Sequence, residues 1–256
     1  MWSAFPDRVF AMRSGPRFNS KAGLRRLILP VLLVALFGTQ CDRGPAAAAG
    51  YDDSISDLAT PGDALPHFRG PDMQPFWPDQ TLLREDPDLR QMQAFEATNQ
   101  SGITVRAADL RGHISVVSFF FATCVGICPR IVRNLLAVQD HFGAQEEVRL
   151  YSFSVTPEVD TTEVLSRYAS RHGIRNTQWD LLRGQRSEIY TMARRAFNAD
   201  TVTPHELRVG MSQDDFLHSG NVYLLDRDGY LRGIYNGFFR NGIDELILDI
   251  ERLREQ

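Results

Sequence analysis

The chain has 256 residues, of which 43% are hydrophobic and 10% aromatic, enough for one sizeable globular domain with additional segments. Residues 1–49 hold seven of the 28 basic and two of the 32 acidic residues, so the remainder has 21 basic and 30 acidic residues and a formal charge of −9. An acidic body of this kind argues against a nucleic acid as partner.

Residues 1–45 have the pattern of an export signal. Six basic residues precede the uncharged run Leu27–Phe37. Because a permanent membrane span needs about 20 apolar residues, this shorter run, which Pro30 interrupts, predicts a cleaved signal and an extracytoplasmic, periplasmic location. Two processing sites compete: the alanine run at 46–49, and Cys41, where a bacterial lipoprotein leader would place its lipidated cysteine and so anchor the protein to the membrane.

Residues 46–90 are expected to form a linker or an extended arm. The segment is rich in Ala, Pro, Asp and Gly and has no sustained hydrophobic periodicity. Phe76 and Trp77 are the exceptions, and we expect them to pack on the domain that follows rather than on a partner. That domain is predicted to occupy residues 91–256.

From residue 95 onward the hydrophobic pattern predicts strands that alternate with helices. In chain order the expected elements are a hairpin in 95–105, a strand in 113–122, a helix after Pro129, a strand in 147–156, a helix carrying Val164, Leu165 and Tyr168, a strand in 178–182, a helix in 187–197, a hairpin in 221–237 and a helix through Ile243, Leu246, Ile250 and Leu253. The strand in 113–122 is almost entirely β-branched or aromatic, as in a central strand buried on both faces. The order predicts an α/β fold of thioredoxin type, with a central sheet flanked by helices, an N-terminal hairpin and a terminal β-hairpin plus helix.

Two clusters of acidic residues are predicted to have structural rather than catalytic or metal-binding roles. Asp160 and Glu163 are spaced as a capping box at the start of the helix with Tyr168, and Glu158 fits the preceding turn. Asp226 and Asp228 resemble part of a calcium loop, but the 12-residue ligand series that ends in Glu is missing. We therefore predict a hairpin turn there.

The cysteines carry the chemistry. Only three are present, and Cys41 lies in the leader, which leaves Cys124 and Cys128 as one pair where the central strand ends and a helix begins. A helix N-terminus favours a thiolate through its dipole and free N–H groups. A purely structural disulfide fits poorly, because so short a loop gains little from a cross-link.

The spacing of the pair leaves two functions open. Three residues separate the cysteines, and side chains four apart on a helix have Cβ atoms about 5–6 Å apart, whereas a disulfide prefers about 3.5–4.5 Å. A bridging metal spans the wider gap more easily. Loop flexibility can still close a disulfide, so a redox pair and a metal clip both remain possible.

His218 is the candidate for a third ligand, just ahead of the strand that begins the terminal hairpin. Two thiolates and one imidazole suit Cu(I), which accepts soft donors and low coordination, and the same set could hold Zn(II) with a water. Copper is favoured for a site in which the protein supplies all three donors. The remaining histidines are expected on the surface or in loops: His67, His113, His141, His172 and His205.

Four stretches, in order, resemble one known family: "FFFATCVGICPR", "FSVTPEVDTTEVLSRYASRHG", "WDLLRGQRSEIYTMARRAF" and "HSGNVYLLDRDGYLRGIYNG". They resemble the SCO/SenC copper-binding proteins, which assist assembly of the copper centre in cytochrome oxidase subunit II. The resemblance covers Phe95 to the C-terminus, implies a thioredoxin-like fold and transfers metal ligation to Cys124, Cys128 and His218. Two positions depart from the family: Val125 stands where proline is frequent, and Leu217 where aspartate is frequent. Neither change removes a ligand.

Two functions follow from this site. The first is a copper metallochaperone that binds a copper ion, Cu(I) or Cu(II), through Cys124, Cys128 and His218 and passes it to the subunit II copper site by ligand exchange, with a copper donor or a thiol reductant as further partner. The alternative is an extracytoplasmic thiol:disulfide oxidoreductase, in which Cys124 attacks as the more exposed thiolate and Cys128 resolves the mixed disulfide. His218 would be dispensable only in the second.

Overall fold

The structure is a computed structural model, and it describes residues 64–78, 83, 86–143, 145–199 and 220–256. The predicted export signal with Cys41, the histidines His205 and His218, and the segment between residues 200 and 219 all lie outside the described residues.

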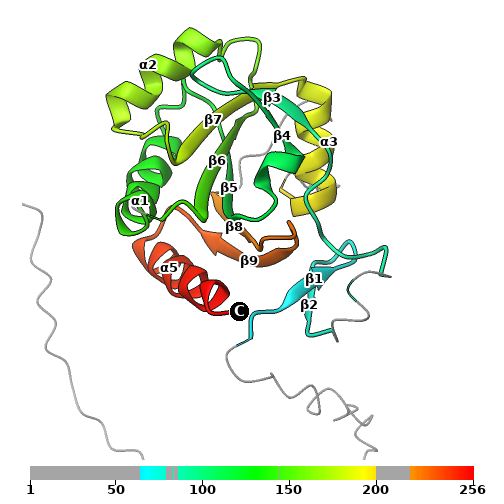
Figure 1. Ribbon diagram of the computed structural model, residues 1–256. Coiled ribbons are helices and arrows are strands. Elements are labelled where there is room, and N and C mark those ends of the chain that lie inside the picture. The colour runs from blue at the N-terminus through cyan, green and yellow to red at the C-terminus, as the bar shows by residue number, and fades with distance from the viewer. Residues whose placement is uncertain (1–63, 79–82, 84–85, 144, 200–219) are drawn as a thin grey trace, which may run out of the picture. The chain divides into compact units, whose positions relative to one another are not determined.

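A mixed seven-stranded sheet forms the centre of the domain, in the order β4-β3-β7-β6-β5-β8-β9 (Figure 1). Its strands are β3 (Glu96–Thr98), β4 (Thr104–Arg106), β5 (Ile114–Phe120), β6 (Val148–Ser154), β7 (Trp179–Gly184), β8 (Asn221–Leu225) and β9 (Leu231–Asn236). The three middle strands β5, β6 and β7 run parallel, and both outer pairs are antiparallel hairpins. Parallel strands place their carboxyl ends at one edge of the sheet, which is where the cysteine loop begins.

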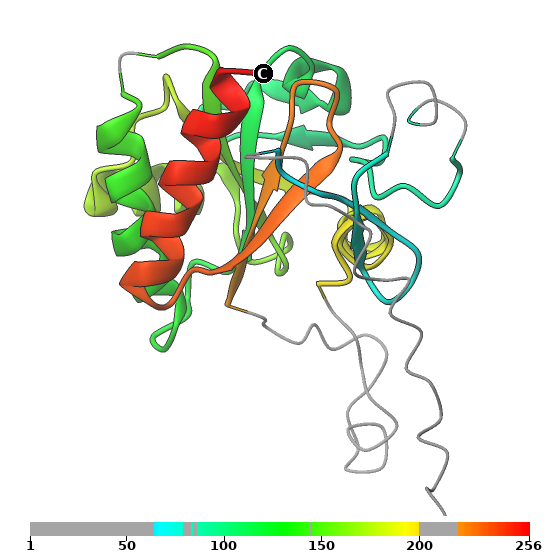
Figure 2. The same cartoon turned by 90° about the horizontal axis from the view of Figure 1, so that it is seen from below.

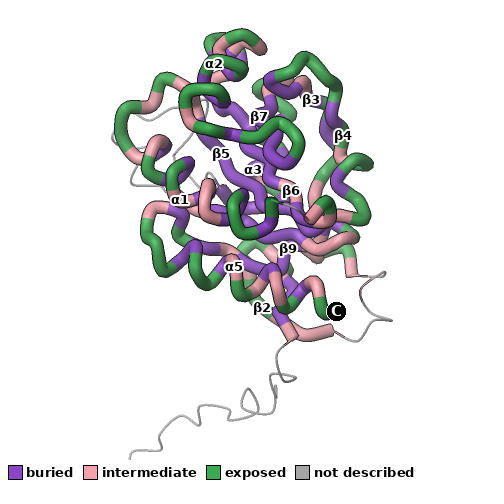
Figure 3. Tube along the Cα trace, turned by 60° about the vertical axis from the view of Figure 1, so that its left-hand side comes forward, coloured by how far each residue is buried: buried purple, intermediate pink, exposed green. Residues whose placement is uncertain are grey.

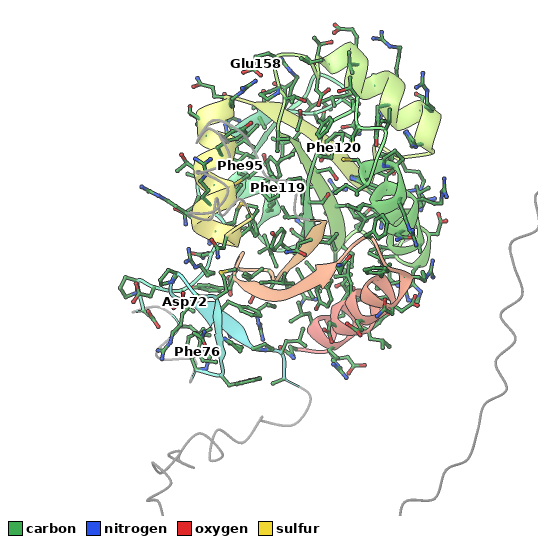
Figure 4. The ribbon with its side chains drawn as sticks, turned by 180° about the vertical axis from the view of Figure 1, so that it is seen from behind. Asp72, Phe76, Phe95, Phe119, Phe120 and Glu158 are labelled. Atoms are coloured by element: carbon green, nitrogen blue, oxygen red, sulfur yellow. The ribbon has the colours of Figure 1, made fainter. Side chains whose placement is uncertain are left out.

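Every residue of β5 is buried, because a hydrophobic core lies on each face of the sheet (Figure 3). The neighbours Phe119 and Phe120 point to opposite faces, as alternation along a strand requires (Figure 4). Polar groups inside this sheet pair with one another: the Ser118 and Ser152 hydroxyls lie 2.7 Å apart, and Trp179 Nε1 donates to Ser152 Oγ at 2.9 Å. The three parallel strands are thus joined by side chains as well as by their backbones.

The helices divide between the two faces of the sheet (Figure 2). They are α1 (Cys128–His141), α2 (Thr162–His172), α3 (Arg186–Phe197) and α5 (Arg240–Arg254), with a short 3-10 turn at Ala107–Leu110. Helices α1, α2 and α5 contribute to the core on one face, and α3 to the core on the other. The predicted apolar positions of α5 are at most 2% exposed, which confirms the amphipathic helix expected there.

The predicted strands and helices are confirmed in order, but the start of α2 differs in detail. Thr161 is the N-cap, with its side chain accepting from the Val164 N–H, and it is Thr161 that meets the Glu163 carboxylate. The prediction that Asp160 caps this helix is wrong, because Asp160 is fully buried and points inward. The turn at Asp226 is confirmed: its Oδ1 accepts from the N–H groups of Asp228 and Tyr230.

Part of the expected linker is a second, two-stranded sheet of β1 (His67–Arg69) and β2 (Gln74–Phe76). The sequence predicts a loop here because Gly70, Pro71 and Pro75 interrupt any alternation of apolar and polar residues. Trp77 Nε1 donates to the Ala64 carbonyl at 2.9 Å, a contact within the expected linker itself, so packing of Trp77 on the domain that follows stays a prediction.

A buried charge pair holds this segment against β9. The Arg232 guanidinium lies 3.0 Å from the Asp226 carboxylate and donates to the carbonyls of Leu65 and Pro66. His67, expected on the surface or in a loop, is instead a buried strand residue, and burial, helped by the Arg232 charge, lowers its pKa to about 3. His67 is therefore a neutral packing residue near neutral pH.

We expect Arg232→Ala to lower the free energy of unfolding by about 3–5 kcal/mol, because it leaves the Asp226 carboxylate buried without its partner. Urea unfolding followed by circular dichroism measures this. The control is Arg240→Ala, which removes an exposed pair with Asp244 at 2.9 Å and should cost less than about 1 kcal/mol. Equal losses in the two variants would contradict a structural role for the buried pair.

Candidate metal centre

The cysteine loop joins the last residue of β5, Phe120, to the first residue of α1, Cys128. No side chain caps this helix at Ile127, and Pro129 occupies its first turn, where a missing N–H costs nothing. The N–H groups of Arg130 and Ile131 donate to the Ile127 carbonyl, whereas the Cys128 N–H faces the loop and donates to the Cys124 sulfur. Cys124 lies within that loop.

Both cysteines are free thiols, but their surroundings differ. Cys128 is only 2% exposed and belongs to the core between the sheet and α1, whereas Cys124 is half-buried and packs against that core from outside. Between them Val125 is 98% exposed. The prediction that Cys124 is the more exposed thiol is confirmed.

Hydrogen-bond donors around the Cys124 sulfur favour its thiolate. Burial is the largest single influence and raises the pKa of Cys124, but four donors together outweigh it: the Cys128 N–H, the Cys128 thiol and the N–H groups of Gly126 and Ile127. The net result is a pKa below the ordinary value for a thiol. A reactive cysteine at a helix N-terminus has this type of environment.

The Cys128 thiol has the opposite tendency. Burial raises the pKa of Cys128 to about 12; the Phe121 backbone opposes this, and the neighbouring Cys124 side chain adds to it. The pair thus divides into one sulfur that carries negative charge readily and one that keeps its proton. Such a division suits a dithiol in which one sulfur meets a partner first.

Tyr168 of α2 lies close enough to Cys124 and Cys128 for negative charge on either sulfur to affect its pKa. Burial raises the pKa of Tyr168 above its ordinary value, and negative charge at Cys128, Cys124 and Asp160 raises it further. Its ring packs on Phe120, with centroids 5.5 Å apart, and its buried hydroxyl has no hydrogen-bond partner among the described residues. The Tyr168 hydroxyl is therefore an uncharged hydrogen-bond donor near the two cysteines, and it has no partner among the described residues.

Asp160 is the residue near the loop that sequence reasoning placed wrongly. Its carboxylate accepts from the Ala122 N–H at 3.2–3.3 Å, the Ser154 hydroxyl at 2.5 Å and the Thr156 hydroxyl at 3.1 Å. Ala122 is 38 positions away in the chain, so no local pattern could have revealed the contact.

The third predicted ligand, His218, lies outside the described residues, so the structure brings together only Cys124 and Cys128. Two free thiols in one loop fit a soft metal ion such as copper, because thiolates are soft donors. Among the described residues no group of three or more His, Cys, Asp or Glu side chains could hold a metal ion. Of the other histidines, His141 is exposed and pairs with Glu251, while His113 and His172 are half-buried.

Comparison with known proteins identifies the family. The family described as SCO1/SenC matches residues 84–254, which include the cysteine loop and both hairpins of the main sheet. The chain belongs to the SCO1/SenC family. The SCO1 protein homolog of Bacillus subtilis (strain 168) is 30% identical over 169 residues, which cover 65% of this chain and 84% of the homolog.

Solved SCO1/SenC structures confirm the thioredoxin-like α/β fold. A SCO1/SenC family lipoprotein from Bacillus anthracis (strain Ames) is 26% identical with a TM-score of 0.56, and covers 64% of this chain and 95% of its own. A second structure, BsSco, is 30% identical with a TM-score of 0.55 and covers 66% and 95% of the two chains. It is described as a member of the Sco family of cytochrome c oxidase assembly proteins in which a disulfide switch was identified.

No helix in the described part of the chain combines the length and the hydropathy that a membrane-spanning helix needs.

The unequal thiols predict selective alkylation. Iodoacetamide reacts with thiolate, so at neutral pH we expect one modification within the Cys124–Cys128 pair, at Cys124, with a pH midpoint below the ordinary value of about 8.5. Cys128→Ala should move that midpoint upward, because it removes a donor to the Cys124 sulfur. Peptide mapping by mass spectrometry gives both results.

Denatured protein provides the control for this measurement, since both thiols should then react at similar rates. Equal reactivity of Cys124 and Cys128 in the folded protein would contradict the described burial.

Proposed function

We propose that this protein is a copper metallochaperone that delivers copper to the copper centre in subunit II of cytochrome c oxidase. The copper is cargo, carried by Cys124, Cys128 and His218 and released by exchange with the recipient's ligands. The observation that carries the proposal is the free C-x-x-x-C thiol pair between β5 and α1 in a chain of the SCO1/SenC family. The description of BsSco as a cytochrome c oxidase assembly protein supports the same recipient.

The path of the chain into β8 supports His218 as the third ligand. Val222 of β8 pairs with Ser118 of β5 in antiparallel register, so β8 begins at the edge of the sheet where β5 ends. Gly220, two residues after His218, lies against Ile131 of α1, where an added Cβ would be 3.7 Å from the Ile131 side chain. The chain therefore enters the sheet beside the helix that begins with Cys128.

The chemistry of the donors favours Cu(I) during transfer. Two thiolates and an imidazole form a soft, three-donor set, and Cu(II) remains a second oxidation state that the family resemblance allows. Because only thiolate binds metal, the pair must be reduced for loading, and a thiol reductant is the expected partner that keeps it so.

The segments before the domain would direct the protein to its place of action. Residues 1–45 act as an export signal, residues 46–90 connect it to the thioredoxin-like domain of residues 91–256, and the protein works in the periplasm. Cys41 is the lipidation site if the leader is processed as a lipoprotein, and this would hold the domain at the membrane that contains the oxidase. The lipoprotein from Bacillus anthracis supports this arrangement.

The asymmetry of the two thiols favours thiol:disulfide exchange as a second candidate function. Cys124 is the accessible sulfur with the lowered pKa, and Cys128 is the buried one with the raised pKa, as an attacking and a resolving cysteine would be. A disulfide switch in BsSco supports the same chemistry. In this function the reduced pair gives two electrons and two protons to a substrate disulfide.

Copper binding tests the first function directly. We expect the reduced, purified protein to bind one Cu(I) per chain under anaerobic conditions, in competition with a chromophoric chelator. Cys124→Ser and His218→Ala should each weaken binding by at least about 10-fold, since each removes a ligand. His141→Ala is the matched control, because His141 is an exposed histidine paired with Glu251, and it should leave the affinity unchanged.

Copper affinity that is the same in wild type and His218→Ala would contradict the three-donor site. If the same variant also keeps disulfide reductase turnover, the oxidoreductase is the better supported function.

A further inference from the structure

The backbone pairing between β5 and β6 ends at Phe120 and Val155, just before the cysteine loop. Phe120 pairs with Ser154, and the Val155 N–H donates to the Phe120 carbonyl at 2.9 Å. If this parallel register continued, the Ala122 N–H would donate to the Val155 carbonyl, and the N–H of residue 157 would donate to Ala122. Residue 157 is proline and has no N–H to give.

Side chains take over the two groups that the ladder would have used. The Val155 carbonyl accepts from the Tyr190 hydroxyl at 3.0 Å. The Ala122 N–H turns to the carboxylate of Asp160 instead. Asp160 therefore replaces a strand as the partner of the backbone at the point where the cysteine loop leaves the sheet.

The carboxylate itself is held firmly. Asp160 is 0% exposed, and its Oδ2 accepts from the hydroxyls of Ser154 and Thr156, while Ser154 Oγ accepts from the Thr156 N–H at 3.1 Å. The Asp160 N–H in turn donates to the Thr156 carbonyl at 3.0 Å. With its backbone and side chain both fixed, Asp160 offers the loop a rigid attachment point.

We propose that Asp160 is the positioning residue of the cysteine loop: by holding the Ala122 amide, it fixes Cys124, two residues further on, beside Cys128 in the dithiol state. Asp160 touches neither sulfur in any described contact and acts through the backbone. The inference deepens the proposed function, because the dithiol is the state that would bind copper.

The anchor should favour the dithiol over the disulfide. Cys128 is fixed as the first residue of α1 and is buried, so closing an S–S bond requires Cys124 to move towards it. A loop tied at Ala122 resists that movement, whereas a loop released from Asp160 does not. Loss of the carboxylate should therefore shift the equilibrium towards the disulfide.

The test is the thiol–disulfide equilibrium of the copper-free protein in glutathione buffers. The Cys124 and Cys128 thiols give two protons and two electrons to glutathione disulfide. The protein thereby gains one intramolecular S–S bond, and the glutathione disulfide becomes two molecules of glutathione. We expect Asp160→Ala to shift this equilibrium towards the protein disulfide on the order of 10-fold, equivalent to about 30 mV for a two-electron couple. Asp160→Asn keeps one side-chain oxygen for the Ala122 N–H and should restore most of the wild-type value.

Asp180→Ala is the matched control. Asp180 is a second buried aspartate, on β7, and its Oδ1 accepts from the Asn99 amide at 2.8 Å. Its loss should lower thermal stability and leave the thiol–disulfide equilibrium unchanged. If Asp160→Ala likewise lowers stability without shifting the equilibrium, Asp160 is only structural and the inference is wrong.

Thr156→Val decides the question if Asp160→Ala does not fold. It leaves the carboxylate in place but removes one of its donors, and it should shift the equilibrium in the same direction by about two- to threefold. No shift in Thr156→Val would overturn the inference. Because copper is absent from the measurement, this failure is separate from failure of the proposed function, which would appear as loss of the His218 effect on copper affinity.

Discussion

The burial of β5 on both faces is the constraint on which the cysteine site depends. Every residue of this strand is at most 5% exposed, so its backbone groups must find partners within the protein. The strand can end only where other groups replace its ladder, and Pro157, Tyr190 and Asp160 together provide that end. The place and direction in which the loop leaves the core are consequently set by a neighbouring strand and its following turn.

Most of the fold could be predicted because its signals are local. The apolar run of β5, the spacing of apolar residues in α5 and the turn of the terminal hairpin each lie within a few residues of chain. The β1–β2 sheet was not predicted because Gly70, Pro71 and Pro75 make this segment resemble a loop. It is held by Arg232, which meets Leu65 from 167 positions away, and such a contact leaves no trace in local sequence.

The position of the two cysteines could also be predicted from local sequence, but the contacts of Asp160 could not. The sequence places Cys124 and Cys128 between a buried strand and a helix start, and the structure agrees. The role of Asp160 could not be predicted, since a carboxylate before a helix fits a cap equally well and Thr161 beside it fits too. Only the fold decides between them, by turning Thr161 towards the helix N–H groups and Asp160 towards Ala122.

The difference in burial between the two sulfurs has a consequence for the order of events at the site. A reagent, protein thiol or metal that approaches from solvent meets Cys124 first, because Cys128 is enclosed by the core. Exchange at the pair would then be sequential, first at Cys124 and then at Cys128, whose thiol lies within hydrogen-bonding reach of the Cys124 sulfur.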